Sequence, residues 1–228
     1  NTYFNIMVGI IIEHKGTIDK FIGDAIMAIY GAPVKYDDDP LQAVYTALEM
    51  IGALGDFNKK QARMGRPTFR IGVGLNTGEV IVGNIGSNQK LDYTCIGDAV
   101  NLASRLEGLT KMYGVPIIIS EYTNTFTRDS IPSREIDAVR VKGKIQPVKI
   151  YQPYKISSEN QKKGYAQFNE GIQYYREKKF EEALDLFSSC KKLLQGDTPS
   201  SIYIDRCKEL ITHPPAEDWD GVYTAKTK

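Results

Sequence analysis

The sequence predicts an α+β domain with a mixed or antiparallel sheet, followed by a small α-helical extension. Short β-like runs, several of them paired around a turn, alternate with helical segments through the first two thirds of the chain. From about Ser157 the pattern becomes polar and helical, with no strand signal. A chain of 228 residues can hold one good-sized domain and an appendage. We therefore predict a domain over residues 1–156 and an extension over residues 157–228.

Composition excludes several classes of protein. The formal net charge is +1, so no bulk electrostatic field attracts nucleic acid. No apolar run approaches the roughly 18 residues of a membrane span. Cys95, Cys190 and Cys207 show no C-x-x-C spacing and are expected to be reduced packing residues of an intracellular protein. The chain starts at Asn1 inside a helical pattern, so we expect it to be a piece of a longer protein.

The domain is predicted to begin with a helix and a hairpin. Asn1–His14 carries apolar residues on one face and is expected to end with Gly16 as its C-cap. Thr17–Ile22 and Ala25–Tyr30 predict two strands joined at Gly23-Asp24, because Gly tolerates the positive φ of a tight hairpin turn.

The remaining segments predict the rest of the domain. Thr77-Gly78 separates two β-like runs, which predicts a second hairpin, and Lys142-Gly143-Lys144 predicts the turn between two closing strands. In chain order these elements are a helix over Pro40–Met64, strands over Arg70–Asn76, Glu79–Gly86 and Tyr93–Ile96, a helix over Gly97–Tyr113, a strand over Val115–Ser120, a short helix over Glu121–Arg128, and strands over Arg140–Gly143 and Pro147–Tyr154.

The sequence of the extension predicts a helical hairpin and one further helix, over Gln161–Lys178, Phe180–Leu194 and Pro199–Ile211. Its apolar and small residues follow the spacing of one tetratricopeptide repeat at Gly171, Tyr174, Ala183 and Phe187. The alternative is a C-terminal cap that packs on the first domain or on a partner. The lone Trp219 in the tail is expected to dock on a neighbouring surface.

Asp24 is the first candidate functional residue. It lies at the hairpin turn, with Lys20 four positions earlier and apolar residues on both sides. A strand–turn–strand unit that presents one carboxylate from a rigid base is suited to holding a divalent cation. The alternative, which the local sequence alone favours, is that Asp24 only satisfies the backbone of its own turn.

Three segments together resemble the class III nucleotidyl cyclases, over roughly residues 1–154. They are DKFIGDAIMA at Asp19–Ala28, LDYTCIGDAVNLASRLE at Leu91–Glu107 and VKGK at Val141–Lys144. The helical V-N-x-A-S-R after an I-G-D turn is the most specific part. The resemblance implies a ferredoxin-like α+β domain related to polymerase palms, which works as a homodimer with active sites at the interface.

The resemblance also implies adenylate cyclase activity, in which two Mg²⁺ or Mn²⁺ ions assist in-line attack of the ribose 3′-hydroxyl on the α-phosphate of ATP. Positioning and electrostatics then dominate catalysis. Asp24 matches the second metal-binding aspartate of the family. Asn101 and Arg105, at i and i+4 on one helix face, match a ribose-orienting asparagine and a phosphate-stabilising arginine. Lys142 matches the phosphate-binding lysine.

Lys20 and Thr94 match the two positions with which the family selects the purine. A lysine that donates to adenine N1 and a hydroxyl beside the exocyclic amine favour ATP, whereas guanylate cyclases carry glutamate and cysteine there. The more familiar adenylate pair is lysine with aspartate, and the lysine–threonine pair resembles a bacterial-type subclass. Relaxed or guanylate specificity stays open, because threonine discriminates weakly.

One part of the family pattern is absent from this sequence. The first metal aspartate belongs to a D-x-x-G-F-T segment whose position would fall upstream of Asn1. The sequence therefore also lacks the first strand of the family fold. We expect residues 1–228 on their own to be inactive without that aspartate.

Two other functions stay open: a non-catalytic nucleotide-binding or dimerisation module, and a partner-binding role for the helical extension. The first predicts loss of several site residues, whereas Asp24, Asn101, Arg105 and Lys142 are all present. The resemblance to sensor-linked bacterial cyclases implies an upstream sensor and membrane domain, with this domain in the cytoplasm. The expected partners are ATP and a second copy of the chain, not nucleic acid.

Overall fold

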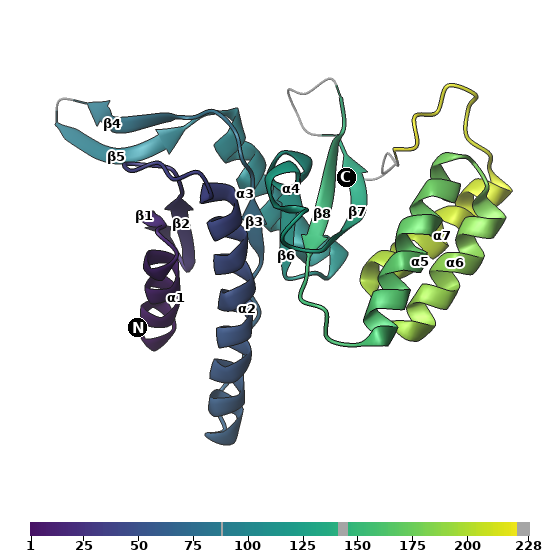
Figure 1. Ribbon diagram of the computed structural model, residues 1–228, viewed down its shortest axis with the longest axis horizontal. Helices are drawn as coiled ribbons and strands as arrows, with labels where there is room; N and C mark the ends of the chain where they lie inside the picture. The colour runs from purple at the N-terminus through teal and green to yellow at the C-terminus, as the bar shows by residue number, and fades with distance from the viewer. Residues whose placement is uncertain (88, 141–145, 223–228) are drawn as a thin grey trace.

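The computed structural model describes residues 1–87, 89–140 and 146–222 and confirms the predicted α+β class. Figure 1 shows a helix and hairpin at the N-terminal end, a central sheet with helices beside it, and three helices toward the C-terminus. The elements in chain order are α1 (Thr2–Glu13), β1 (Thr17–Ile22), β2 (Ala25–Ile29), α2 (Asp39–Arg63), β3 (Val73–Leu75), β4 (Ile81–Ser87), β5 (Lys90–Ile96), α3 (Asp98–Tyr113), β6 (Ile117–Ser120), α4 (Glu121–Thr127), β7 (Ser133–Val139), β8 (Val148–Pro153), α5 (Glu159–Arg176), α6 (Phe180–Leu193) and α7 (Thr198–Thr212).

A four-stranded sheet in the order β3-β6-β8-β7 forms the centre of the molecule. β3 and β6 are parallel, whereas β6 with β8 and β8 with β7 are antiparallel. The pairs β1–β2 and β4–β5 are separate two-stranded antiparallel sheets, and β4–β5 projects as an arm away from the central sheet (Figure 1). The central sheet is mixed, which is one of the two alternatives that the sequence predicts.

The second predicted hairpin, around Thr77-Gly78, is wrong. β3 pairs with β6, while β4 pairs with β5, so this connection leads from one sheet to another. The Asn76 side chain holds it: its amide donates to the carbonyl oxygen of Ala99 at 3.0 Å, and its carbonyl accepts from the Ser120 hydroxyl at 2.6 Å. These bonds fasten the chain to α3 and β6 and direct it away from β3.

The predicted C-cap of α1 is also displaced. The C-cap is His14, and the residue with positive φ is Lys15 (φ 64°), not Gly16. Gly16 instead donates its N–H to the carbonyl oxygen of Ile11 at 2.8 Å. A Cβ on Gly16 would lie 2.7 Å from the ring of Tyr30, so glycine is required here for packing. The helix ends where predicted, but for a different reason.

The central strand β6 is buried on both faces and separates two apolar cores. Ile117 and Ile119 pack with α2 residues on one face, whereas Ile118 packs with α3 residues on the other. The first core consists of Val44, Ala47, Ile117, Ile119 and Ile131. The second consists of Leu102, Leu106, Tyr113, Val115, Ile118, Ile136, Val148 and Ile150.

Among the described residues, no helix is long and apolar enough to cross a membrane.

The helical extension has its own core. Its three predicted helices are confirmed, with ends that differ by at most two residues. Phe168 on α5, Phe187 on α6 and Tyr203 on α7 are buried together, with ring centroids 4.7 to 5.7 Å apart. Trp219 docks on the same core, edge-on to Tyr175.

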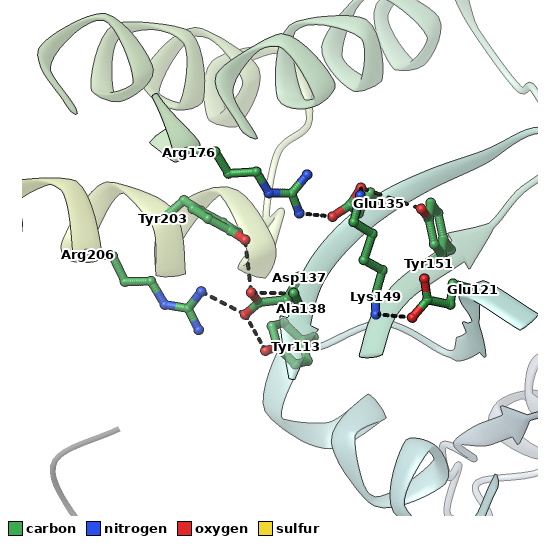
Figure 2. A network of polar contacts seen from close by, with 10 residues as sticks. All are labelled: Tyr113, Glu121, Glu135, Asp137, Ala138, Lys149, Tyr151, Arg176, Tyr203 and Arg206. Carbon is green, nitrogen blue, oxygen red and sulfur yellow. Dashed lines mark hydrogen bonds and ion pairs between the residues drawn. The ribbon is translucent and has the colours of Figure 1, made fainter. Parts of the chain in front are cut away.

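The extension is fastened to the sheet through buried charges on β7 (Figure 2). Arg206 of α7 pairs with Asp137 of β7 at 2.7 Å, and both side chains are less than a tenth exposed. Asp137 also accepts hydrogen bonds from Tyr113 of α3 at 2.5 Å and from Tyr203 of α7 at 3.0 Å. Burial alone would lower the pKa of Arg206, but the Asp137 carboxylate outweighs it and raises that pKa.

Two further pairs join β7 to the extension. Arg134, 1% exposed, donates to both carboxylate oxygens of Asp197, at 2.5 and 3.1 Å. Glu135 accepts a hydrogen bond from Arg176 of α5 (Figure 2). The first closing strand is β7, at Ser133–Val139, and not at Arg140–Gly143 as predicted. Its charged residues conceal the strand in the sequence, because the residues that neutralise them lie far along the chain. Val141–Gly143 lie outside the described residues.

We predict that Arg206→Met destabilises the protein by about 3–5 kcal/mol, because removing one partner leaves the Asp137 carboxylate buried without a cation. Urea unfolding followed by circular dichroism would measure this loss. Lys59→Ala is the control, since its ion pair with Asp56 is exposed to solvent. Equal unfolding midpoints for the two variants would contradict the role of the buried pair.

Candidate functional site

The hairpin β1–β2 presents Asp24 to solvent at its tip. Ile22 pairs with Ala25, so Gly23 and Asp24 form a two-residue turn, and Gly23 has φ 63°. A positive φ at the first central position is typical of a type II′ hairpin turn, which favours glycine there. Asp24 is exposed, and its negative charge adds to burial in raising the pKa of Tyr3 on α1. A rigid turn thus carries one accessible carboxylate.

A β-bulge lies at Asp19 on the same hairpin. Ile18 pairs with Ala28 and Lys20 pairs with Met27, so Asp19 is an extra residue in β1. In a regular strand, neighbouring side chains point to opposite faces. The bulge re-aims them, and Lys20 Nζ lies 3.2 Å from a carboxylate oxygen of Asp19.

Asp19 also joins the hairpin to β5. Its other carboxylate oxygen accepts a hydrogen bond from the Thr94 hydroxyl at 2.6 Å and from the Cys95 backbone N–H at 3.3 Å. The Asp19 side chain has no exposed area, whereas the Lys20 side chain is 40% exposed. Burial raises the pKa of the Cys95 thiol, and the Asp19 charge raises it further. Lys20 and Thr94, the two predicted base-selecting residues, therefore both contact Asp19, for which the sequence predicts no role.

Asn101 and Arg105 lie on the exposed side of α3, as their i, i+4 spacing predicts. The opposite side of the helix, with Leu102 and Leu106, is buried in the core. Gly74 of β3 lets the helix approach closely: a Cβ there would lie 2.2 Å from the Glu107 backbone nitrogen. Close backbone packing against β3 thus fixes the position of α3 relative to the sheet.

The structure gives less information on two predicted parts of the site, the phosphate-binding lysine and the metal ligands. Lys142 lies outside the described residues. Within residues 1–87, 89–140 and 146–222, no cluster of three or more histidine, cysteine or carboxylate side chains forms a metal site. Among these described residues, Asp24 therefore belongs to no such cluster.

Asp19 is the site residue that sequence reasoning missed. The signal was an acidic residue directly before Lys20 in an otherwise apolar strand. Its partner Thr94 is 75 positions away, so only the fold reveals the contact.

The matched family model is described as the adenylate and guanylate cyclase catalytic domain, and it covers residues 1–156. The match covers more than half of the chain, and the chain therefore belongs to this family. The solved adenylyl cyclase CyaB from P. aeruginosa is 36% identical, with a TM-score of 0.64 over 70% of this chain and 82% of that one. The α+β arrangement is thus the cyclase catalytic fold, with α5–α7 as a C-terminal helical region.

Two curated relatives are adenylate cyclases by name. The terminal-differentiation specific adenylate cyclase of Dictyostelium discoideum is 37% identical over 219 residues, which is 92% of this chain and 10% of the relative. The adenylate cyclase of Anabaena cylindrica is 41% identical over 159 residues, which is 67% of this chain and 31% of the relative. The chain thus spans less than a third of the length of either.

We predict that Gly74→Ala destabilises the fold by about 1–3 kcal/mol, because the new methyl group would collide with the backbone of α3. Gly108→Ala is the matched control: it lies on α3 with open space around its Cβ position. This control is expected to gain about 0.5–1 kcal/mol from helix propensity. Denaturant unfolding of both variants tests the prediction, which a stable Gly74→Ala protein would refute.

Proposed function

We propose that this domain is the catalytic domain of an adenylate cyclase, which converts ATP to 3′,5′-cyclic AMP and pyrophosphate. The observation that carries the proposal is the juxtaposition of Lys20 and Thr94 around Asp19. Lys20 is proposed to donate to adenine N1, and the Thr94 hydroxyl is proposed to accept from the exocyclic amine. The family likeness alone does not choose the purine, because the family contains both adenylate and guanylate cyclases.

The reaction forms a bond between the ribose 3′-oxygen and the α-phosphorus and breaks the bond to the pyrophosphate oxygen. Asn101 is proposed to orient the ribose, so that the 3′-oxygen lies in line with the leaving group. Arg105, one helical turn later, is proposed to stabilise the negative charge that grows on the reacting phosphate. Lys142 is proposed to bind the phosphates. The exposure of Asn101 and Arg105 on one face of α3 supports these roles.

Asp24 is proposed as one ligand of two Mg²⁺ or Mn²⁺ ions. Such ions, when bound, would lower the pKa of the 3′-hydroxyl and neutralise charge on the pyrophosphate. We propose that the second aspartate ligand lies upstream of Asn1 and that residues 1–228 alone are inactive without it.

The active sites are proposed to form between two copies of the chain. Each strand of the Lys20–Thr94 pair ends in an exposed apolar residue, Ile22 of β1 at 58% and Ile96 of β5 at 47% exposed. A second protomer would cover this surface. Lys20 and Asp24, on one short hairpin, would then serve opposite active sites.

The finer assignments of the whole protein are also proposals. Residues 1–156 are proposed as the catalytic domain and residues 157–228 as a tetratricopeptide-like extension, since the glycine at 171 packs against Phe187 of the facing helix. An upstream sensor and membrane domain, with this domain in the cytoplasm, is proposed from the resemblance to sensor-linked bacterial cyclases. The relatives are longer than this chain, which covers 10% and 31% of the two named above.

The test is cyclic AMP formation by the full-length protein with Mg²⁺ or Mn²⁺, measured by chromatography. Arg105→Ala is expected to lower kcat by about 10²–10³-fold with little change in KM, because its charge acts on the transition state. Lys111→Ala, an exposed cation on the same helix, is the control and should retain normal turnover.

Normal turnover of Arg105→Ala would overturn its catalytic role. A wild-type protein that binds ATP but yields no product would favour the non-catalytic module instead. Preferential cyclisation of GTP would replace the proposed activity by guanylate cyclase activity.

A further inference from the structure

The contact between Asp19 and Thr94 bears on how this site distinguishes adenine from guanine. A threonine hydroxyl has one hydrogen and two lone pairs, so it can donate or accept and normally discriminates poorly. An ionised carboxylate can only accept. At 2.6 Å from Asp19, the Thr94 hydroxyl has committed its hydrogen to the carboxylate. Only its lone pairs then remain for another group.

We propose that Asp19 is a specificity-determining positioning residue, which orients the Thr94 hydroxyl as an acceptor and aligns Lys20 beside it. This inference rests on the proposed function. An oriented acceptor attracts the 6-amino group of adenine and repels the 6-carbonyl oxygen of guanine, because two acceptors cannot share a hydrogen. Asp19 thereby converts an ambiguous hydroxyl into a selective one.

Three contacts hold the Asp19 side chain in place. The Cys95 backbone N–H and the Thr94 hydroxyl donate to one oxygen, and the Lys20 ammonium lies beside the other. These contacts fix the orientation of the carboxyl group toward Thr94.

Asp19 acts through its neighbours and does not itself face a nucleotide. Its side chain has no exposed area, whereas Lys20 is 40% exposed. The β-bulge places the extra residue so that both side chains reach the same side of the hairpin. Opposite Thr94 in the β4–β5 pair lies Gly83, whose Cβ position is surrounded by open space. Within the described β4–β5 pair, no cross-strand side chain therefore lies beside Thr94, which is itself 7% exposed.

The test compares Asp19→Ala with the wild type in the full-length protein, using the ratio of kcat/KM for ATP to that for GTP. We expect the ratio to fall at least about tenfold, equivalent to about 1.4 kcal/mol, because the freed hydroxyl can donate to guanine. Merely structural damage would lower both activities and leave the ratio unchanged. Asp92→Ala is the control: it removes an exposed carboxylate from β5, the strand that carries Thr94, and it should keep the ratio within about twofold.

Asp19→Asn separates orientation of the hydroxyl from general loss of charge. Asparagine keeps an oxygen that can accept from Thr94, so this variant should retain more of the ATP preference than Asp19→Ala. Equal losses in the two variants would overturn the orientation of Thr94 by Asp19. If Asp19→Ala does not fold, Asp19→Ser gives the same test, because its hydroxyl fills part of the site without being an obligate acceptor.

Displacement of a fluorescent ATP analogue by ATP and by GTP provides a second readout. It separates the two proposals, because it measures base selection even in a protein that makes no product. A wild type without cyclase activity refutes the proposed function, while its ATP-to-GTP binding ratio still tests Asp19. An unchanged ratio in Asp19→Ala, or no base preference in the wild type, overturns the inference.

Discussion

The fold depends on neutralising three charged residues that lie close together on one strand of the central sheet, Arg134, Glu135 and Asp137. A buried charge without a partner costs several kcal/mol, and each of these is paired with a residue of the C-terminal helices. The partners are Asp197, Arg176 and Arg206. The strand can be buried only when the extension is folded against it. Tyr113, at the end of α3, joins the same network, which therefore reaches the helix that carries Asn101 and Arg105.

The helices and the central strand could be predicted from the sequence because their signals are local. The spacing of Leu102 and Leu106 marks the buried side of α3, and the run Ile117–Ile119 marks a strand buried on both faces. The common exposed face of Asn101 and Arg105 follows from the same periodicity, since residues one turn apart share a face.

The remaining features could not be predicted because they depend on partners distant in the sequence. β7 carries charges that are unfavourable in a buried strand until Asp197, 63 positions from Arg134, is in place. The segment at Thr77-Gly78 has the composition of a hairpin turn, yet side-chain bonds from Asn76 direct it into another sheet. Asp19 resembles an ordinary polar residue in a strand, and only the fold reveals the bulge and the contact with Thr94.

Trp219 gives the molecule a built-in optical probe. It is the only tryptophan in the sequence, so all indole fluorescence arises from one place. That place is the edge of the extension core, where the ring lies 5.3 Å from Tyr175 and 5.7 Å from Phe180, and its Nε1 donates to the carbonyl oxygen of Val222. Detachment of the tail would expose the ring to water and shift its emission to longer wavelength. The spectrum therefore reports on the C-terminal helices without a label, because the rest of the chain contributes no indole emission.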